Sequence, residues 1–306
     1  MGDRLKGRVA IVTGAGRGIG RGEALALASE GAIVIINDVG GAVDGTGATT
    51  GPADDVANEI KKMGGQAMAN YDSIVEYATG EKLVKQALDN FGKLDIVVNN
   101  AGILRDRMIF NMAEEEFDAV IAVHLKGHFN LMRHACTYFR QARHPGVIVN
   151  TSSTSGLGNV GQTNYAAAKE GIVGMTRTVA REMGRYGVRV NAIRPMAATR
   201  MTLSDDMRQR AARAGEAGLA MLAELEKQVP EQIGPFVAWL CSDEASNING
   251  RTFLVRAGYI GLYSEPEIIA AVETDKPWTV DLVSQLVSKQ VTANLVNEWP
   301  LQPPKE

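Results

Sequence analysis

Residues 8–20 run Arg-Val-Ala-Ile-Val-Thr-Gly-Ala-Gly-Arg-Gly-Ile-Gly, and this stretch indicates the fold. Its first half is a short apolar run rich in β-branched residues, which predicts a buried strand. The glycines follow at once, and an apolar-faced helical pattern then runs from Glu23 to Glu30. A phosphate-binding loop requires this context, because glycines let the backbone approach a pyrophosphate and the helix N-terminus offers free N–H groups.

The glycine spacing differs from the usual G-x-G-x-x-G, because Ile19 stands where the third glycine belongs. The pattern is instead T-G-x-x-x-G-x-G, through Thr13, Gly14, Gly18 and Gly20. Taken alone, this pattern is only moderately specific for a dinucleotide site.

Asp38 follows the second predicted strand, where an acid can accept hydrogen bonds from a ribose diol and repel a 2′-phosphate. Arg17 in the glycine loop argues the other way, since it could meet a phosphate; alternatively it is a solvent-facing loop residue. We give Asp38 the greater weight and predict NAD as the cofactor. Asp72 and Ser73, after the third predicted strand, could touch the adenine or simply form a turn.

Strands alternate with helical patterns along most of the chain, which predicts an α/β protein with a doubly wound parallel sheet, the Rossmann fold. We expect one domain over 1–258, with a substrate loop or lid at about 196–230, and a C-terminal extension over 259–306. In that extension, short helices should begin at Ser264 and Thr279, before a proline-rich end. The expected strands are 8–13, 33–36, 66–70, 94–98, 147–149, 188–193 and 252–255, and the expected helices include 52–63, 76–90, 114–136 (interrupted near 127) and 230–241.

A second stretch, residues 150–171, carries candidate catalytic groups. Ser152 and Ser153 end the fifth strand, and a helix then carries Tyr165 and Lys169. Residues four apart share one helix face, so the ammonium can lie near the phenol and lower its pKa from about 10. A serine hydroxyl can hold an alcohol or carbonyl oxygen beside that phenol. The alternative is a surface Tyr–Lys pair without function.

Composition excludes several classes of protein. The 306 residues carry a formal net charge of −3, which gives no electrostatic case for binding nucleic acid or an anionic membrane. Two cysteines support neither a disulfide framework nor a metal cluster. His124 and His128 have metal-ligand spacing but lack the glutamate of H-E-x-x-H, so we expect no metal. Without an apolar leader, a membrane-spanning run or a peroxisomal address at 304–306, we expect a cytoplasmic protein.

The glycine loop, the Asn99-Asn-Ala-Gly102 run, a serine on the fifth strand and Tyr165-x-x-x-Lys169 together resemble the short-chain dehydrogenase/reductase family over residues 5–258. The resemblance implies that Tyr165 is the general acid/base, that Lys169 lowers its pKa and holds the nicotinamide ribose, and that a serine orients the substrate oxygen. It also implies a homodimer or homotetramer through helices around 105–140 and 160–183. The implied cofactor-binding residues are Gly14, Arg17, Gly18, Ile19, Gly20, Asp38, Asp72, Ser73, Asn99, Ala101, Gly102, Tyr165, Lys169 and Pro195.

A narrower resemblance is to the (3R)-hydroxyacyl-CoA dehydrogenase domain of peroxisomal multifunctional enzyme type 2. It implies NAD-linked interconversion of a (3R)-hydroxyacyl-CoA and a 3-oxoacyl-CoA. The alternative within enzymes is a hydroxysteroid dehydrogenase or another secondary-alcohol dehydrogenase. From a different class, the protein could be a non-catalytic NAD-binding scaffold, but the intact Ser/Tyr/Lys set argues against that. The segments that carry the likeness are 35–41, 69–73, 100–107, 123–127 and 158–165.

Several positions depart from the family pattern. His124 stands where many members carry a catalytic asparagine. Two residues are candidates for the catalytic serine. Ser152 has the number of residues before the tyrosine that the family shows, whereas alignment of the strand end favours Ser153 and requires a one-residue deletion in the loop. Met196 replaces the usual glycine after Pro195, and the following segment 205–228 is longer than in the narrower group. That segment could be a solvated helix, a subunit contact or a mobile lid that Gly215 and Gly218 weaken or hinge, so substrate identity and direction stay open.

Overall fold

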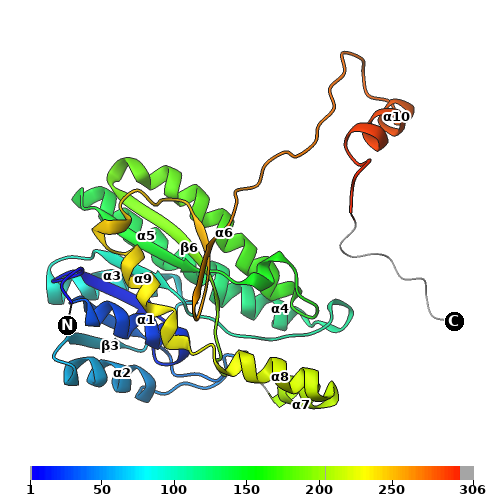
Figure 1. The fold of residues 1–306 in the computed structure, drawn as a ribbon. Coiled ribbons are helices and arrows are strands. Elements are labelled where there is room, and N and C mark those ends of the chain that lie inside the picture. Colours follow the sequence, from blue (N-terminus) through cyan, green and yellow to red (C-terminus); the bar gives the residue numbers. More distant parts are fainter. Residues whose placement is uncertain (1, 204, 297–306) are drawn as a thin grey trace. The chain divides into compact units, whose positions relative to one another are not determined.

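Eight strands form one sheet in the order β3-β2-β1-β4-β5-β6-β7-β8. All pairs up to β7 are parallel, and β8 adds an antiparallel edge. The expected doubly wound parallel sheet is therefore present, flanked by helices (Figure 1). The strands are β1 (Val9–Thr13), β2 (Ile33–Asn37), β3 (Gln66–Asn70), β4 (Ile96–Asn99), β5 (Gly146–Thr151), β6 (Val188–Met196), β7 (Thr252–Arg256) and β8 (Tyr259–Leu262).

The computed structural model describes residues 2–203 and 205–296, and the chain forms two units, Met1–Tyr263 and Ser264–Glu306. All seven strands expected from the sequence are present in the first unit. The eighth strand was not predicted; it follows a turn at Gly258, whose φ of +70° favours glycine. The proline-rich end that the sequence analysis noted lies outside the described residues from 297 on.

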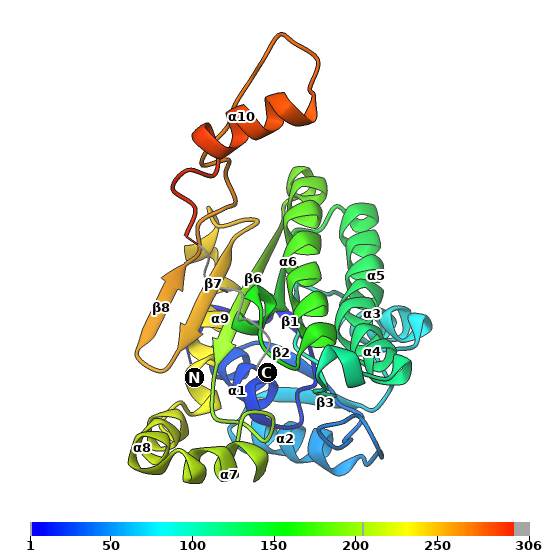
Figure 2. The ribbon, with the colours of Figure 1, turned by 90° about the vertical axis from the view of Figure 1, so that its right-hand side faces the viewer.

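Helices cover both faces of the sheet, and each face has its own apolar core (Figure 2). Because both faces are covered, β1 is buried along its whole length, as is typical of a parallel sheet. One face packs against α1 (Gly18–Ser29), α2 (Gly51–Lys62) and α9 (Gly234–Leu240), and the other against α3 (Tyr77–Phe91), α5 (Gly127–Ala142) and α6 (Thr163–Met183). The first unit also contains α4 (Glu114–Ile121), α7 (Asp205–Arg213) and α8 (Gly215–Glu226).

The chain order reverses between β1 and β4, which are neighbours in the sheet. Connections leave such a point in opposite directions and open a crevice at the carboxyl ends of the strands. Thr13 Oγ1 accepts hydrogen bonds from the backbone N–H groups of Asn100 and Ala101, both at 3.1 Å. The Asn100 side chain in turn donates to the backbone oxygens of Thr13 and Gly14. These bonds tie the glycine loop to the end of β4.

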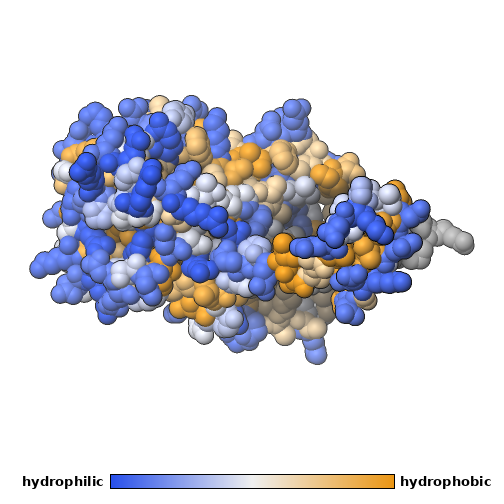
Figure 3. Space-filling model, turned by 90° about the horizontal axis from the view of Figure 1, so that it is seen from above, coloured by the Kyte–Doolittle hydropathy of each residue, from blue (hydrophilic) through white to orange (hydrophobic). Residues whose placement is uncertain are grey.

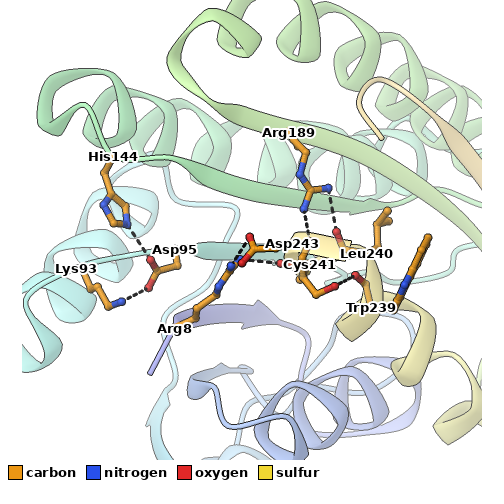
Figure 4. A network of polar contacts seen from close by, with 10 residues as sticks. Arg8, Lys93, Asp95, His144, Arg189, Trp239, Leu240, Cys241 and Asp243 are labelled. Atoms are coloured by element: carbon orange, nitrogen blue, oxygen red, sulfur yellow. Dashed lines mark hydrogen bonds and ion pairs between the residues drawn. The ribbon is translucent and has the colours of Figure 1, made fainter. Parts of the chain in front are cut away.

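A network of charged groups ties the structure together at the amino ends of the strands (Figure 4). Arg8, just before β1, donates to the Cys241 carbonyl oxygen at 3.0 Å. Arg189 in β6 donates to the Leu240 carbonyl oxygen, also at 3.0 Å. The end of α9 is therefore held against two strands, at the sheet edge opposite the crevice.

The helical pattern predicted over 114–136 contains a wider turn. Helix α4 passes into a π-helical turn, Ala122–Lys126, and continues as α5. The interruption expected near Gly127 takes the form of this turn. Single π turns often occur at functional sites, and this one carries His124.

The segment 205–228 folds as two helices, α7 and α8. Gly215 separates them with a φ of +67°, so the break predicted at this glycine is confirmed. Gly218 lies inside α8, where a Cβ would come within 2.3 Å of the Ala211 carbonyl oxygen. The absence of a side chain at Gly218 therefore lets the two helices approach closely.

The second unit contains one of its two predicted helices. Helix α10 (Val280–Gln290) begins as expected at Thr279, whose hydroxyl accepts a hydrogen bond from the Leu282 N–H at 3.1 Å. The helix predicted at Ser264 is absent, so that prediction is wrong. Ile268 and Ile269 are 86% and 92% exposed, and a short helix without a packing surface is marginal in water.

The molecular surface is mixed in polarity (Figure 3). Hydrophilic side chains cover much of the view, and hydrophobic residues are exposed in separate groups between them. Within residues 2–203 and 205–296, no helix has the combination of length and apolar character that crossing a bilayer demands.

Candidate active site

Two cavities open at the carboxyl edge of the sheet and share part of their lining. The first has a volume of about 400 Å³ and the second about 570 Å³, within the range of small-molecule sites. Because the walls are shared, one ligand can extend from the first cavity into the second. The shared residues are Ile19, Asn100, Gly102, Thr199 and Met201.

The first cavity is formed by the glycine loop and the ends of β2, β3 and β4. A Cβ on Gly14 would lie 2.7 Å from the Ala101 Cα, and the φ of Gly14 is +62°, so the loop needs glycine there. The bare backbone at the start of α1 provides the surface that a diphosphate requires. Of the predicted cofactor residues, this cavity is lined by Gly14, Arg17, Gly18, Ile19, Asp38, Asp72, Ser73, Ala101 and Gly102.

Asp38 is anchored to the glycine loop, since its Oδ2 accepts a hydrogen bond from the Gly16 N–H at 2.8 Å. Its carboxylate lines the first cavity at the end of β2, where a ribose diol would lie. Arg17 and Arg200 line the same cavity, and both donate to the Gly41 carbonyl oxygen, at 3.2 and 3.4 Å. Asp72 and Arg105 line it as well, so the cavity offers two acids and three cations to a bound dinucleotide.

The second cavity has a polar end and an apolar wall. Ser153, Tyr165 and Lys169 line the polar end. Met207 of α7 and Met221 of α8 contribute to the wall, so the segment considered as a lid does line this cavity. The other apolar wall residues include Val160, Met196, Met201 and Leu225. A substrate with a polar head and a long apolar tail matches this division.

The two candidate serines have different surroundings. Ser152 is buried, and its hydroxyl donates to the Lys169 carbonyl oxygen at 2.7 Å. The Ser153 side chain forms a hydrogen bond with the Tyr165 side chain and accepts another from the Ser155 N–H at 3.1 Å. The structure thus brings Ser153 to the phenol, and Ser152 fixes the strand end to α6.

The acidity of Tyr165 differs from expectation. Burial raises the pKa of Tyr165 to about 12, although the hydrogen bond with Ser153 acts in the opposite direction. We expected Lys169 to lower this pKa, but burial has the larger effect and the net change is upward. The Lys169 Nζ donates to the Thr151 carbonyl oxygen at 2.6 Å and lies 5.4 Å from the centre of the tyrosine ring.

His124 packs edge-on against Tyr165, with ring centres 5.0 Å apart and an interplanar angle of 87°. Its Nε2 lies 3.0 Å from the Ile103 N and 2.8 Å from the Ile103 O. Burial lowers the pKa of His124 well below its ordinary value, so the ring is neutral near pH 7. Among the residues that the structure describes, no three His, Cys, Asp or Glu side chains group as metal ligands, around His128 or elsewhere.

Two residues predicted at the cofactor site lie outside the lining of both cavities. Asn99 is fully buried, and its side chain donates to the Asn150 Oδ1 at 3.0 Å. Its neighbour Asn100 lines both cavities instead. Gly20 packs inside the loop, because a Cβ there would lie 2.3 Å from the Gly14 carbonyl oxygen. Pro195 lines the second cavity.

Arg194 is a site residue that the sequence analysis missed. It is 3% exposed, and it donates to the Ser153 carbonyl oxygen and to Glu170 Oε2, both at 2.7 Å. These bonds hold the serine loop against α6. The missed signal is an arginine placed among apolar residues near the end of a buried strand, since a buried charge needs partners.

Known proteins are similar to this chain in sequence and in fold. The family model for short chain dehydrogenases matches residues 8–210. A hydroxyacyl-CoA dehydrogenase of Mycobacterium tuberculosis is 45% identical over 276 residues, which cover 86% of this chain and 82% of that protein. The peroxisomal multifunctional enzyme type 2 of Mus musculus is 43% identical over 286 residues, 92% of this chain but 36% of the mouse enzyme. The crystal structure of a short chain dehydrogenase from Mycobacterium avium superposes with a TM-score of 0.79 at 44% identity and covers 93% of this chain and 94% of that one.

Proposed function

The chain belongs to the short-chain dehydrogenase family and is an oxidoreductase acting on CH–OH groups, and we propose that it interconverts (3R)-hydroxyacyl and 3-oxoacyl thioesters with NAD(H). The observation that carries this proposal is the second cavity, with a hydroxyl-rich end opposite a methionine-rich wall. The polar end suits an alcohol or ketone oxygen, and the wall suits an acyl chain. The likeness to a hydroxyacyl-CoA dehydrogenase supports the thioester.

The residues of the first cavity fit a nicotinamide dinucleotide, which when bound supplies the hydride acceptor for alcohol oxidation. The glycine loop has the bare backbone that a pyrophosphate needs. Asp38 supports NAD, because a carboxylate at the end of the second strand favours a ribose diol and repels a 2′-phosphate. Arg17 and Arg200 line the same cavity, so replacement of Asp38 is the decisive test of cofactor choice.

In the proposed oxidation, the Ser153 hydroxyl holds the substrate oxygen and Tyr165 Oη takes the hydroxyl proton; in the reduction, Tyr165 returns it. Because burial holds the pKa of Tyr165 at about 12, the phenolate needs electrostatic stabilisation. The Lys169 ammonium, 5.4 Å from the ring centre, is the cation placed to supply it.

The test is NAD reduction at 340 nm with a panel of (3R)-hydroxyacyl-CoAs of several chain lengths beside 17β-hydroxysteroids. We expect turnover of the thioesters and its loss in Tyr165→Phe. Tyr138→Phe is the matched control, because Tyr138 packs in the core of the α5 face. Turnover of steroids alone would contradict the proposed substrate, and no turnover with either class would contradict the proposed function.

The proposal includes a cytoplasmic homodimer or homotetramer, as the family resemblance implies. Exposed apolar side chains in the 105–140 region, at Ile109, Phe110 and Phe129, support such an assembly. Light scattering coupled to size-exclusion chromatography measures the mass, and a monomer would contradict this part of the proposal.

A further inference from the structure

Arg194, in the carboxyl half of β6, joins two parts of the candidate site. It is 3% exposed. Its Nη1 donates to the Ser153 carbonyl oxygen at 2.7 Å, and its Nη2 donates to Glu170 Oε2, also at 2.7 Å. Glu170 directly follows Lys169 on α6. A single side chain therefore connects the residue that carries the candidate serine hydroxyl to the helix that carries Tyr165 and Lys169.

The Ser153 carbonyl group is an effective point at which to hold this residue. Ser153 caps the one-turn 3₁₀ helix Thr154–Leu157, and its carbonyl oxygen also accepts a hydrogen bond from the Gly156 N–H at 3.1 Å. Its hydroxyl accepts another from the Ser155 N–H, also at 3.1 Å. Because the Cα–Cβ bond has a fixed direction relative to the backbone and the side chain takes only a few rotamers, anchoring the carbonyl group also sets where the hydroxyl points.

The guanidinium is enclosed on two further sides. A Cβ at Gly156 would lie 2.9 Å from the Arg194 Nη1 and 3.0 Å from Glu170 Oε2, so the serine loop packs directly against the ion pair. The ring of Tyr263, just after β8, lies 5.1 Å from the Arg194 Cζ, within the range of a cation–π contact. Since close-packed groups transmit displacements, a change in this cluster should move the serine loop.

The cluster is a poor source of stability. Burying a guanidinium costs solvation free energy, and attraction to a carboxylate offsets this cost only when the pair is well shielded. The Glu170 side chain is 46% exposed, so water screens the attraction. The Arg194 Nε is buried and has no hydrogen-bond partner among the described residues. The geometry that this arginine imposes therefore explains its burial better than stability does.

We propose that Arg194 is a positioning residue that, anchored on α6 through Glu170, holds Ser153 at the place beside Tyr165 where it binds the substrate oxygen. The inference rests on the proposed function, because it takes the Ser153 hydroxyl as the group that holds that oxygen. Ser153 and Tyr165 line the second cavity, whereas Arg194 lines neither cavity, so its effect on the reaction acts through Ser153.

Arg189 provides a matched control on the same strand. Like Arg194, it donates from β6 to main-chain carbonyl oxygens, those of Leu240 and Ser242, both at 3.0 Å. These contacts lie at the amino end of the strand, away from the crevice. Arg189→Met therefore measures what the loss of a partly buried arginine of β6 does to the protein in general.

The direct test needs no substrate. It records NMR spectra of cofactor-free protein that contains tyrosine labelled with ¹³C at Cζ, and the Tyr165 resonance is the one absent from Tyr165→Phe. Ser153→Ala removes the hydroxyl that forms a hydrogen bond with the phenol and shows where the resonance then lies. We expect the resonance in Arg194→Met and in Glu170→Ala to move toward this position, and in Arg189→Met to stay at the wild-type position.

Two of the variants leave the buried arginine in place, so the test does not depend on the folding of Arg194→Met. Glu170→Ala removes a half-exposed acid, and Gly156→Ala pushes the serine loop away from the ion pair without changing any charge. Both should move the Tyr165 resonance in the same direction as Ser153→Ala does.

The second measurement separates kcat from KM for alcohol oxidation. A misplaced Ser153 weakens the hold on the reacting oxygen but leaves the cofactor cavity and the apolar wall in place. We expect kcat and kcat/KM to fall together by about 10- to 100-fold in Arg194→Met, with KM and the dissociation constant for NAD within about two-fold. Arg194→Lys, which keeps the charge but not the two-pronged geometry, should recover part of the loss. A purely structural role predicts instead that Arg194→Met and Arg189→Met lose activity only in proportion to the folded protein lost.

The outcomes separate the two proposals. An unmoved Tyr165 resonance in both Arg194→Met and Glu170→Ala overturns the inference, and so does a near-normal kcat in both. An equal movement in Arg189→Met also overturns it, because general loosening would then be the cause. Wild-type protein that oxidises none of the alcohols refutes the proposed function, while the tyrosine spectra still decide whether Arg194 holds Ser153 against the phenol.

Discussion

Glu23→Gln should stabilise the protein increasingly as the pH rises from 5 to 8. Burial raises the pKa of this carboxyl from its ordinary value of 4.5 to about 8. In the unfolded chain the carboxyl is exposed and loses its proton near its ordinary value, whereas the folded protein keeps the proton until about pH 8. The folded state therefore binds more protons in this interval, and its stability falls as the pH rises through it. Glutamine has no proton to lose and escapes this penalty.

The size of this change in the free energy of unfolding follows from the width of the pH interval. Each pH unit corresponds to about 1.4 kcal/mol, so the three units from pH 5 to 8 give about 4 kcal/mol. Lys169 adds the opposite slope, because burial lowers its pKa from 10.5 to about 7 and the unfolded chain holds the extra proton between these values. The wild-type protein should accordingly be least stable between about pH 7 and 8 and more stable on either side.

The assay is urea unfolding of the cofactor-free proteins at pH 5, 6, 7 and 8, followed by tryptophan fluorescence. We expect the free energy of unfolding of Glu23→Gln, relative to wild type, to grow by about 4 kcal/mol across this range. Glu30→Gln changes the acid that follows the last residue of α1 and keeps Glu23, so this control should keep the fall in stability with rising pH. Parallel curves for wild type and Glu23→Gln would refute the argument that the folded protein holds this carboxyl protonated.

Three further predictions concern the candidate site and the core. Tyr165→Phe should lower kcat by about 10²- to 10⁴-fold while the dissociation constant for NAD, measured by calorimetry, stays within about two-fold; near-normal turnover would exclude Tyr165 as the proton acceptor. Asp38→Ser should narrow the preference for NAD over NADP, measured as the ratio of the two kcat/KM values, and an unchanged ratio would remove Asp38 from cofactor selection. Gly146→Ala should destabilise the protein by about 1–3 kcal/mol in urea unfolding, because the new Cβ would lie 2.5 Å from the Phe139 ring. Gly174→Ala is its control, since no described residue outside its own turn of α6 comes within 4 Å of the added atom, and it should be neutral or slightly stabilising; equal stability of both variants would contradict the clash.

Strands and helix ends that depend only on residues close to them in the chain could be predicted from the sequence. Strand β3 has the predicted bounds, Gln66–Asn70, because an apolar run between turn residues suffices to define it. The break at Gly215 and the start of α10 at Thr279 depend on one residue each, a glycine with positive φ and a capping hydroxyl. Strand β8 and the absent helix at Ser264 depend instead on whether a partner surface exists. The edge of β7 pairs with β8, whereas Ile268 and Ile269 are almost fully exposed among the described residues.

At the candidate site, the sequence alone determined that Tyr165 and Lys169 share a helix face and that a glycine loop opens onto the sheet edge. Only the tertiary structure decided that Ser153 meets the phenol and that Lys169 binds the Thr151 carbonyl oxygen. The physical reason is that spacing along the chain specifies which face a side chain shares with its near neighbours. The proton affinity of a buried group depends instead on desolvation and on charges that distant segments bring close, and the packing of the whole sheet determines both.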